Sequence, residues 1–218
     1  IDFTQGATEL GVEWHSASDF MMDGFKMSAS YSTDSGAAAT ATAIAQNSWG
    51  IGGTYVTDAG DTAITIGAGL AAVDYTNTGT AITNDKGGMH IGLSAVTGDL
   101  TVAVGYGDGD TIVDDGGTAA LASTQVDGSV TKAGISYVSG DITFKLGMVS
   151  GSAKDSSTIG TAGTTDDAYD ETDASVSYAV ASGVTAIIGY TTVDLQDEGS
   201  SVTDSGGSAW YIGANLAF

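Results

Sequence analysis

Apolar and small or polar residues alternate along most of the chain. The segment 99–107 reads DLTVAVGYG, and its alternate positions are Leu100, Val102, Val104 and Tyr106. The same alternation recurs in residues 86–96 (KGGMHIGLSAV) and 141–149 (DITFKLGMV). A period of two places every second side chain on the same face of a β-strand. The pattern therefore predicts an all-β protein whose strands have one apolar face.

The alternation predicts about eleven antiparallel strands, each roughly 9 to 13 residues long, which suits a tilted membrane-crossing strand. They are expected to begin near residues 8, 20, 47, 62, 87, 99, 130, 141, 173, 184 and 208. Residues 36–46, GAAATATAIAQ, are the one stretch that could form a short helix. Their Gly, Thr and Ala content fits a loop about equally well.

Three connections between strands are short and resemble one another. They read VTGDLT, VSGDIT and VASGVT, with Gly98, Gly140 and Gly183 where a two-residue hairpin requires positive φ. Two looser turns near Ser18 and Ala59 complete a series whose members are 41, 39, 42 and 43 residues apart. This spacing predicts a repeated hairpin.

Long connections alternate with the short turns and are rich in Gly, Ser, Thr and Asp. They are expected around residues 32–46, 76–86, 107–128, 151–172 and 194–206. Short turns at one edge, long polar loops at the other and membrane-length strands between them are typical of an outer-membrane β-barrel.

The charged residues inside the strands fall on the polar face, opposite the apolar positions. We interpret this face as the wall of a water-filled pore, because its remaining residues are mostly Gly, Ser, Thr and Ala. The predicted pore-lining residues are Glu9, Glu13, His15, Lys26, His90, Lys132 and Lys145. The apolar face carries aromatic residues near the strand ends, as membrane-interface girdles do. A secreted β-sandwich or β-solenoid is the alternative, since its strands also alternate.

Composition excludes several functions. The 218 residues include 27 Asp and Glu but only 5 Lys and no Arg, which gives a formal charge of −22. A nucleic-acid binder needs a basic face, so nucleic acid is excluded as a partner. The chain has no Cys and two His, which argues against thiol chemistry and histidine-rich metal sites. His15 follows Glu13 on one face but has no identifiable nucleophile in register, so we predict no enzymatic activity.

The acidic clusters suggest a second hypothesis. Hard oxygen ligands in Gly-rich loops are those that Ca²⁺ prefers, although no EF-hand spacing is present. The candidate ligands are Asp108, Asp110, Asp114, Asp115, Asp166, Asp167, Asp170 and Glu171. A solvated, mutually repelling surface explains them as well. Divalent cations bridging them to lipopolysaccharide or to a neighbouring subunit would offset that repulsion. No cofactor is required by the predicted fold.

The chain ends SAWYIGANLAF, with alternating apolar residues up to Phe218. This ending resembles the terminal strand of Gram-negative outer-membrane proteins, in which a Gly, spaced hydrophobic residues and a final Phe are read by the barrel-assembly machinery. The matching residues are Gly213, Leu216 and Phe218. With the SGD-type turns and Asp/Gly-rich loops, the whole chain resembles the C-terminal part of an alphaproteobacterial, Rhodobacter-like general diffusion porin.

This resemblance implies an outer-membrane homotrimer in which each barrel has about sixteen strands. Such porins pass small hydrophilic solutes without chemistry, through a pore narrowed by an infolded third loop. The acidic residues of that loop face an Arg and Lys cluster on the opposite wall. This chain has no Arg. The basic half would therefore rest on Lys26, Lys132 and Lys145, or on residues outside the sequence.

We accordingly expect residues 1–218 to form a single β-barrel domain, with about five further strands on a separate chain, a proteolytic product or an unrecorded part of the sequence. The expected function is passive diffusion of small solutes and ions with a weak preference for cations. One alternative is a surface or adhesive β-protein that binds Ca²⁺ through its acidic loops. A substrate-specific channel fits less well, because Tyr211 is nearly the only aromatic residue on the polar face.

Overall fold

The computed structural model describes residues 10–33, 43–77, 86–111, 126–154, 166–196 and 204–217. It contains eleven β-strands, as the alternation predicts. Their bounds are β1 (Leu10–His15), β2 (Phe25–Thr33), β3 (Ala43–Ala59), β4 (Thr62–Asn77), β5 (Lys86–Thr97), β6 (Leu100–Thr111), β7 (Val126–Ser139), β8 (Ile142–Lys154), β9 (Asp166–Ala181), β10 (Val184–Gln196) and β11 (Ser205–Leu216). No helix long and apolar enough to cross a bilayer occurs among these described residues.

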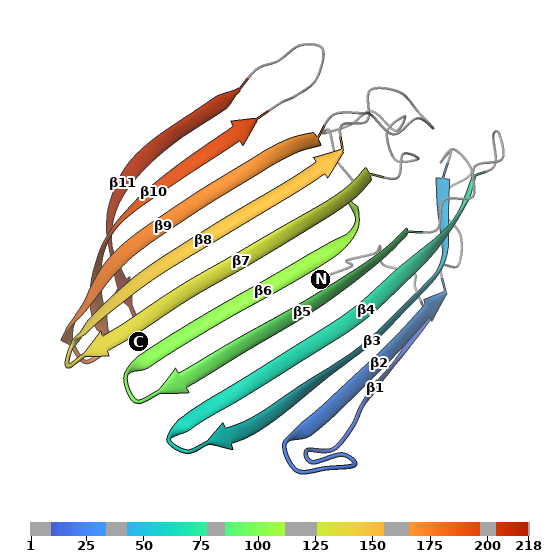
Figure 1. The fold of residues 1–218 in the computed structure, drawn as a ribbon, viewed down its shortest axis with the longest axis horizontal. Helices are drawn as coiled ribbons and strands as arrows, with labels where there is room; N and C mark the ends of the chain where they lie inside the picture. The colour runs from blue at the N-terminus through green and yellow to red at the C-terminus, as the bar shows by residue number, and fades with distance from the viewer. Residues whose placement is uncertain are drawn as a thin grey trace.

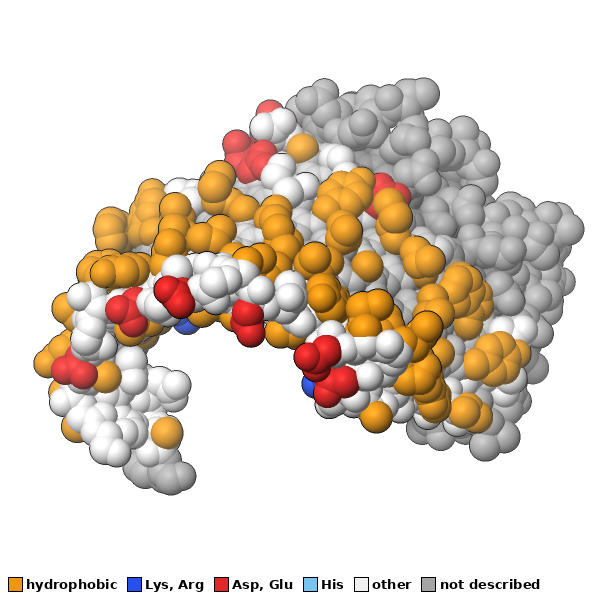
Figure 2. Space-filling view, turned by 60° about the horizontal axis from the view of Figure 1, so that its bottom comes forward, with side chains coloured by type: hydrophobic (Ala, Val, Ile, Leu, Met, Phe, Trp, Pro, Cys, Tyr) orange, Lys and Arg blue, Asp and Glu red, His pale blue; other side chains and the backbone are white. Residues whose placement is uncertain are grey.

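All eleven strands belong to one antiparallel sheet, and each pairs with the strand that follows it in the sequence. Figure 1 shows the strands running side by side from β1 at one edge to β11 at the other. The sheet is strongly curved, with a convex and a concave face (Figure 2). Nearest-neighbour antiparallel order confirms the predicted hairpin repeat.

The tight turns lie where the sequence predicts them. Gly98, Gly140 and Gly183 have φ values of 55°, 60° and 76°, and Gly60 in the looser turn near Ala59 has φ 65°. Only glycine adopts this left-handed conformation at little cost. One glycine therefore determines the backbone conformation of each of these turns.

The connection between β1 and β2 is longer than the sequence predicts, so β2 begins at Phe25 rather than near residue 20. The carboxylate of Asp19 accepts a hydrogen bond of 2.7 Å from the amide of Gly24. The amide of Phe20 donates to the carbonyl of Phe25 over 2.8 Å. Gly24 has φ 75°, and a Cβ there would lie 1.9 Å from the carbonyl oxygen of Val56. These contacts fold the segment into a fixed loop instead of extending the strand.

Several strands extend further into the expected long connections. β3 begins at residue 43 instead of near 47, β7 at 126 instead of near 130, and β9 at 166 instead of near 173. Gly, Asp and Asn are depleted in strands, yet the added length of β9 pairs with β8 from Asp166 and with β10 from Ala168. Pairing on both sides outweighs the weak intrinsic preference. The part of the possible helix at 36–46 that is described, residues 43–46, belongs to β3, and the rest lies outside the described residues.

The convex face holds the large apolar side chains (Figure 2). None of the large side chains among the described residues is fully buried, and Ile212 and Trp210 on β11 are 86% and 73% exposed. A sandwich would cover such a face with a second sheet, whereas the described strands form a single one. The β-sandwich interpretation is therefore wrong for the part of the chain that is described.

Candidate pore wall

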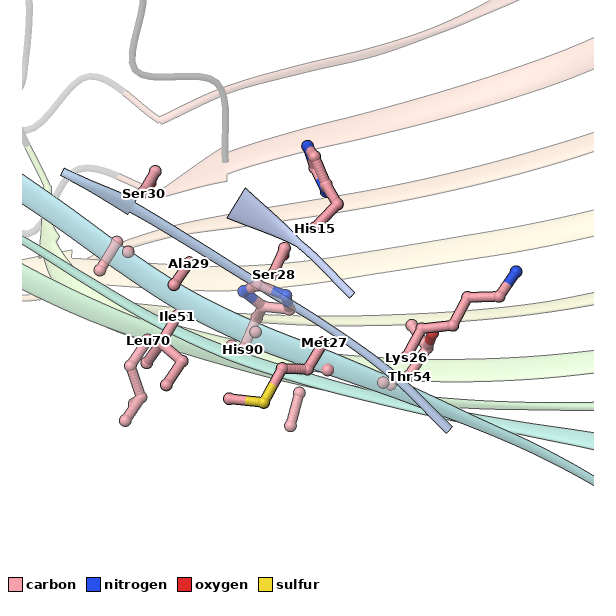
Figure 3. Close-up of a pocket in the computed structure, with 18 of the residues that line it drawn as sticks. His15, Lys26, Met27, Ser28, Ala29, Ser30, Ile51, Thr54, Leu70 and His90 are labelled. Carbon is pink, nitrogen blue, oxygen red and sulfur yellow. The ribbon is translucent and has the colours of Figure 1, made fainter. Parts of the chain in front are cut away.

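The concave face is a layer of small and polar residues that cross-strand pairing places in rows. One row joins His15, Ser28, Gly52, Gly69 and His90 across β1 to β5. This part of the wall borders an open hollow of about 960 Å³ lined by residues of β1 to β6. Figure 3 shows Lys26, Ser28 and Ser30 on one side of β2 and Met27 on the other. Adjacent residues of β2 therefore lie on chemically different faces of the sheet.

Four predicted pore-lining residues meet in this hollow: Glu13, His15, Lys26 and His90. The Nε2 atom of His15 lies 2.9 Å from a carboxylate oxygen of Glu13, and both side chains are about two-thirds exposed, at 66% and 67%. Ion pairs this exposed contribute about 0.2–1 kcal/mol to stability. The pair is therefore a feature of the wall surface rather than a structural anchor. Glu9 lies outside the described residues.

The imidazole of His90 lies against the backbone of Gly69. A Cβ at Gly69 would come within 2.5 Å of the ring atom Cε1 of His90. Glycine at this position therefore lets the ring lean across β4 toward β3 instead of projecting straight from the wall. Sequence alternation predicts the face of His90 but not this tilt, which depends on the residue opposite.

Lys132 and Lys145 are exposed residues of β7 and β8. Cross-strand pairing aligns Lys132 with Gly105 of β6 and Lys145 with Ser175 of β9. Both lysines therefore belong to the concave face, but neither lines the hollow: Lys132 lies on the strand next to β6, and Lys145 one strand further along the sheet. The structure does not bring all the predicted pore-lining residues into one cluster, and their role in a pore stays a prediction.

Two tyrosine–carboxylate pairs on the same face were not among the predicted pore-lining residues. The hydroxyl of Tyr211 on β11 donates to the carboxylate of Asp173 on β9, with oxygen distances of 3.1 and 3.3 Å. The hydroxyl of Tyr169 donates to the carboxylate of Glu171 on β9. Alternation carried back from residues 175 and 177 would have placed both acids on this face. The contact from β11 to β9 has no signal in the sequence.

The candidate Ca²⁺ ligands on described strands are divided between β6 and β9 and lie on both faces of the sheet. Asp108, on β6, accepts a hydrogen bond of 2.9 Å from Tyr106 on the convex face. Asp170 and its neighbour Glu171 point to opposite faces of β9, and Asp167 lies on the same strand. Within the described residues, no group of three possible ligands could hold a metal ion. The remaining candidates are Asp110 and Asp166, which are strand residues without described side chains, and Asp114 and Asp115, which lie outside the described residues.

The predicted assembly signal lies at the end of β11. Gly213 pairs with Ile187 and Leu216 with Val184 on β10, while Phe218 lies outside the described residues. Leu216 is 54% exposed on the convex face. Nothing in the structure tests recognition of this strand by assembly machinery, so that role stays a prediction.

The aromatic residues of the convex face are not confined to the strand ends. Tyr137 and Tyr178 flank the tight turns, whereas Tyr106 lies near the middle of β6. Tyr190 and Trp210 lie near the middle of β10 and β11 and form a pair with ring centroids 4.7 Å apart, so the prediction of aromatic residues near the strand ends is wrong for them. An exposed apolar convex face opposite a polar concave face is typical of the wall of a transmembrane β-barrel.

Comparison with protein families shows to which family this chain belongs. The model of the Gram-negative porin family matches residues 12–216, so the chain belongs to that family and to the bacterial outer membrane. The family is one of channels rather than enzymes. A search of curated proteins finds no significant match.

Solved porin structures share the fold. The trimer form of OmpT, an outer-membrane protein of Vibrio cholerae, has 18% identity and a TM-score of 0.56 over 94% of this chain. A porin refined at 1.8 Å resolution has 20% identity and a TM-score of 0.56 over 97% of this chain. OccAB4 of Acinetobacter baumannii has 10% identity and a TM-score of 0.58 over 96%. This chain covers 64%, 66% and 53% of those three chains, respectively, so it spans about half to two thirds of their length.

Proposed function

We propose that this chain forms the larger part of a barrel of about sixteen strands, of the alphaproteobacterial diffusion-porin type, with a water-filled lumen. The observation that carries the proposal is the contrast between the two faces of one sheet, apolar outside and small or polar inside. Small residues leave room for water along the wall. Small hydrophilic solutes and ions would cross by passive diffusion, which needs no catalytic group.

The proposal also includes a homotrimer, for which the trimer form of OmpT among the similar structures is the support. Membrane lipid would contact the convex apolar face. Lipopolysaccharide and divalent cations, Ca²⁺ among them, would meet the carboxylates of the long-connection edge. β11 would be the strand that the barrel-assembly machinery reads.

Selectivity is proposed to be weakly in favour of cations. The formal charge of −22 attracts cations to the channel mouth, and the lumen would combine this field with both signs of charge on the wall. Lys26, Lys132 and Lys145 offset the acidic residues locally. A transverse arrangement of opposite charges favours dipolar over apolar solutes.

Conductance in planar lipid bilayers tests this function. The complete protein, purified from outer membranes in detergent, is expected to produce stepwise openings in groups of three, and an unboiled gel should show a heat-modifiable oligomer. The reversal potential under a KCl gradient should indicate cation preference. Anion preference would contradict the proposed selectivity. A silent bilayer together with a detergent-free soluble monomer would contradict the channel itself.

A further inference from the structure

The concave face has a gap in its side-chain layer on β7 and β8. Gly134 and Gly147 are paired across these strands and occupy neighbouring inward positions. A Cβ at Gly147 would meet no atom within 4 Å, and one at Gly134 would meet only the carbonyl oxygen of Leu146, at 3.5 Å. The floor of the gap is therefore bare backbone that is open to the lumen.

Lysines lie at opposite ends of this gap. Lys132 precedes Gly134 by two residues and Lys145 precedes Gly147 by two residues, so all four share a face. Because β7 and β8 are antiparallel, the lysines lie on opposite sides of the glycine pair. Neither lysine forms an ion pair within 4 Å among the described residues. The pair found there joins Glu13 to His15. The flexible stems of both lysines allow their ammonium groups to reach the space above the glycines.

A carboxylate closes the third side. Asp173 of β9 is the direct cross-strand partner of Gly147. Its position is fixed by the hydroxyl of Tyr211, 3.1 Å away. The side chain of Tyr211 crosses β10 over Gly189, where a Cβ would lie 2.1 Å from the ring atom Cζ. The carboxylate is thus held beside the gap by a contact that spans three strands.

We infer that this glycine gap, formed by Lys132, Gly134, Lys145, Gly147 and Asp173, binds small zwitterionic solutes of the α-amino acid type. The lysines face the carboxylate of such a solute, and Asp173 faces its ammonium group. Neighbouring strands are about 5 Å apart, so charges of both signs lie within reach of one small solute. A simple cation or anion meets repulsion from one side of the gap. The inference rests on the proposed channel function and names a solute class for it.

Liposome swelling tests this preference, because glycine and the uncharged propionamide are similar in size and neither carries net charge. The complete protein is reconstituted, and the ratio of the two swelling rates is measured. Lys145→Gln and Asp173→Asn are each expected to lower the glycine-to-propionamide ratio about two- to fivefold, as for an exposed charge pair. Asp61→Asn, which removes one exposed charge from the turn between β3 and β4, is the control and should leave the ratio unchanged.

Filling the gap is a second test that alters no charge. Gly147→Val has open space for its side chain and should fold, while removing access to the bare backbone. Gly92→Val is the matched control, because Gly92 faces the lumen on β5 and the nearest atom to a Cβ there would be the carbonyl oxygen of Val104, at 3.7 Å. Gly147→Val alone should lower the ratio. Equal ratios in all variants that still conduct KCl would overturn the inference but leave the proposed channel intact, whereas absence of swelling with both solutes in the unmodified protein would overturn both.

Discussion

Single glycines determine where the backbone of this sheet turns and where side chains lie flat against it. Gly24 and Gly60 both have positive φ, at 75° and 65°, but their surroundings differ. A Cβ at Gly24 would lie 1.9 Å from the carbonyl oxygen of Val56, whereas one at Gly60 would meet nothing within 4 Å. An alanine at Gly60 would therefore add backbone strain alone, whereas an alanine at Gly24 would add both backbone strain and steric overlap.

Gly24→Ala is expected to destabilise the protein more than Gly60→Ala. The left-handed conformation costs a non-glycine residue about 1–2 kcal/mol, and both variants incur that cost. Only the first also displaces the β1–β2 loop from β3. The free energy of unfolding, measured by urea titration in lipid vesicles, should fall by about 1–2 kcal/mol for Gly60→Ala and by more for Gly24→Ala. Equal losses would mean that the overlap with Val56 is relieved without cost.

The strand is the scale at which the sequence is most informative. Alternation predicts all eleven strands and the inner face of Lys26, Lys132 and Lys145, because side-chain direction in a strand is a local property. The prediction that charged residues inside strands lie on the polar face is wrong for Asp108, which accepts a hydrogen bond from Tyr106 on the convex face of β6. Gly98 and Gly140 likewise mark their turns through local backbone preference. Non-local contacts account for the errors in strand bounds. The carboxylate of Asp19 fixes the first loop, and pairing extends β9 to Asp166 on the side of β8 and to Ala168 on the side of β10.

The candidate pore wall shows the same difference between local features, which the sequence predicts, and non-local contacts, which it does not. The sequence assigns Lys132 and Lys145 to the inner face by parity, and the pairing of β7 and β8 agrees. It assigns Glu171 to a loop, whereas the structure has it on β9 bonded to Tyr169. The contact of Tyr211 with β9 was beyond prediction, because it requires the register of three strands and a glycine between them.

Adjacent residues on β6 test the assignment of the two faces. Val104 is 47% exposed on the apolar face, whereas its neighbour Ala103 pairs with Ser94 and Gly134 on the concave face. Val104→Arg is expected to destabilise the folded protein by about 2–4 kcal/mol, since an Arg near the bilayer midplane carries that cost. Ala103→Arg should fold normally and shift the reversal potential toward anions. Similar stability of both variants in vesicles would contradict the assignment.

The orientation of the hairpins can be tested with single cysteines, because the chain has none of its own. Asp99 lies in the tight turn between β5 and β6. Ser205 is the first residue of β11, at the edge of the sheet where the long connections lie. Both residues are exposed. Tight turns of such barrels face the periplasm and long loops face the exterior. A membrane-impermeant maleimide should therefore label Ser205→Cys on intact cells and Asp99→Cys only after the cells are lysed. The reverse pattern would require the barrel to be inserted upside down.

At the scale of the whole molecule, charge and shape are separable contributions to transport. The wall consists mainly of small residues, so the width of the lumen is expected to control the passage of uncharged solutes. The formal charge of −22 is instead expected to act at long range, through the field at the channel mouth. Fields of exposed charges are screened by salt, whereas the pore dimensions are not.

Cation preference should therefore depend on ionic strength. The screening length is about 10 Å near 0.1 M salt and about 3 Å near 1 M, so charges that act across the lumen at low salt act only at the wall at high salt. With the same concentration ratio of KCl across the bilayer, the reversal potential should indicate a clear cation preference near 0.1 M and a smaller one near 1 M. Swelling rates with an uncharged sugar serve as the control and should not change with salt. A preference that is equally strong at both concentrations would place its origin in close-range contacts within the lumen, such as those of Glu171 and Asp173, rather than in the net charge.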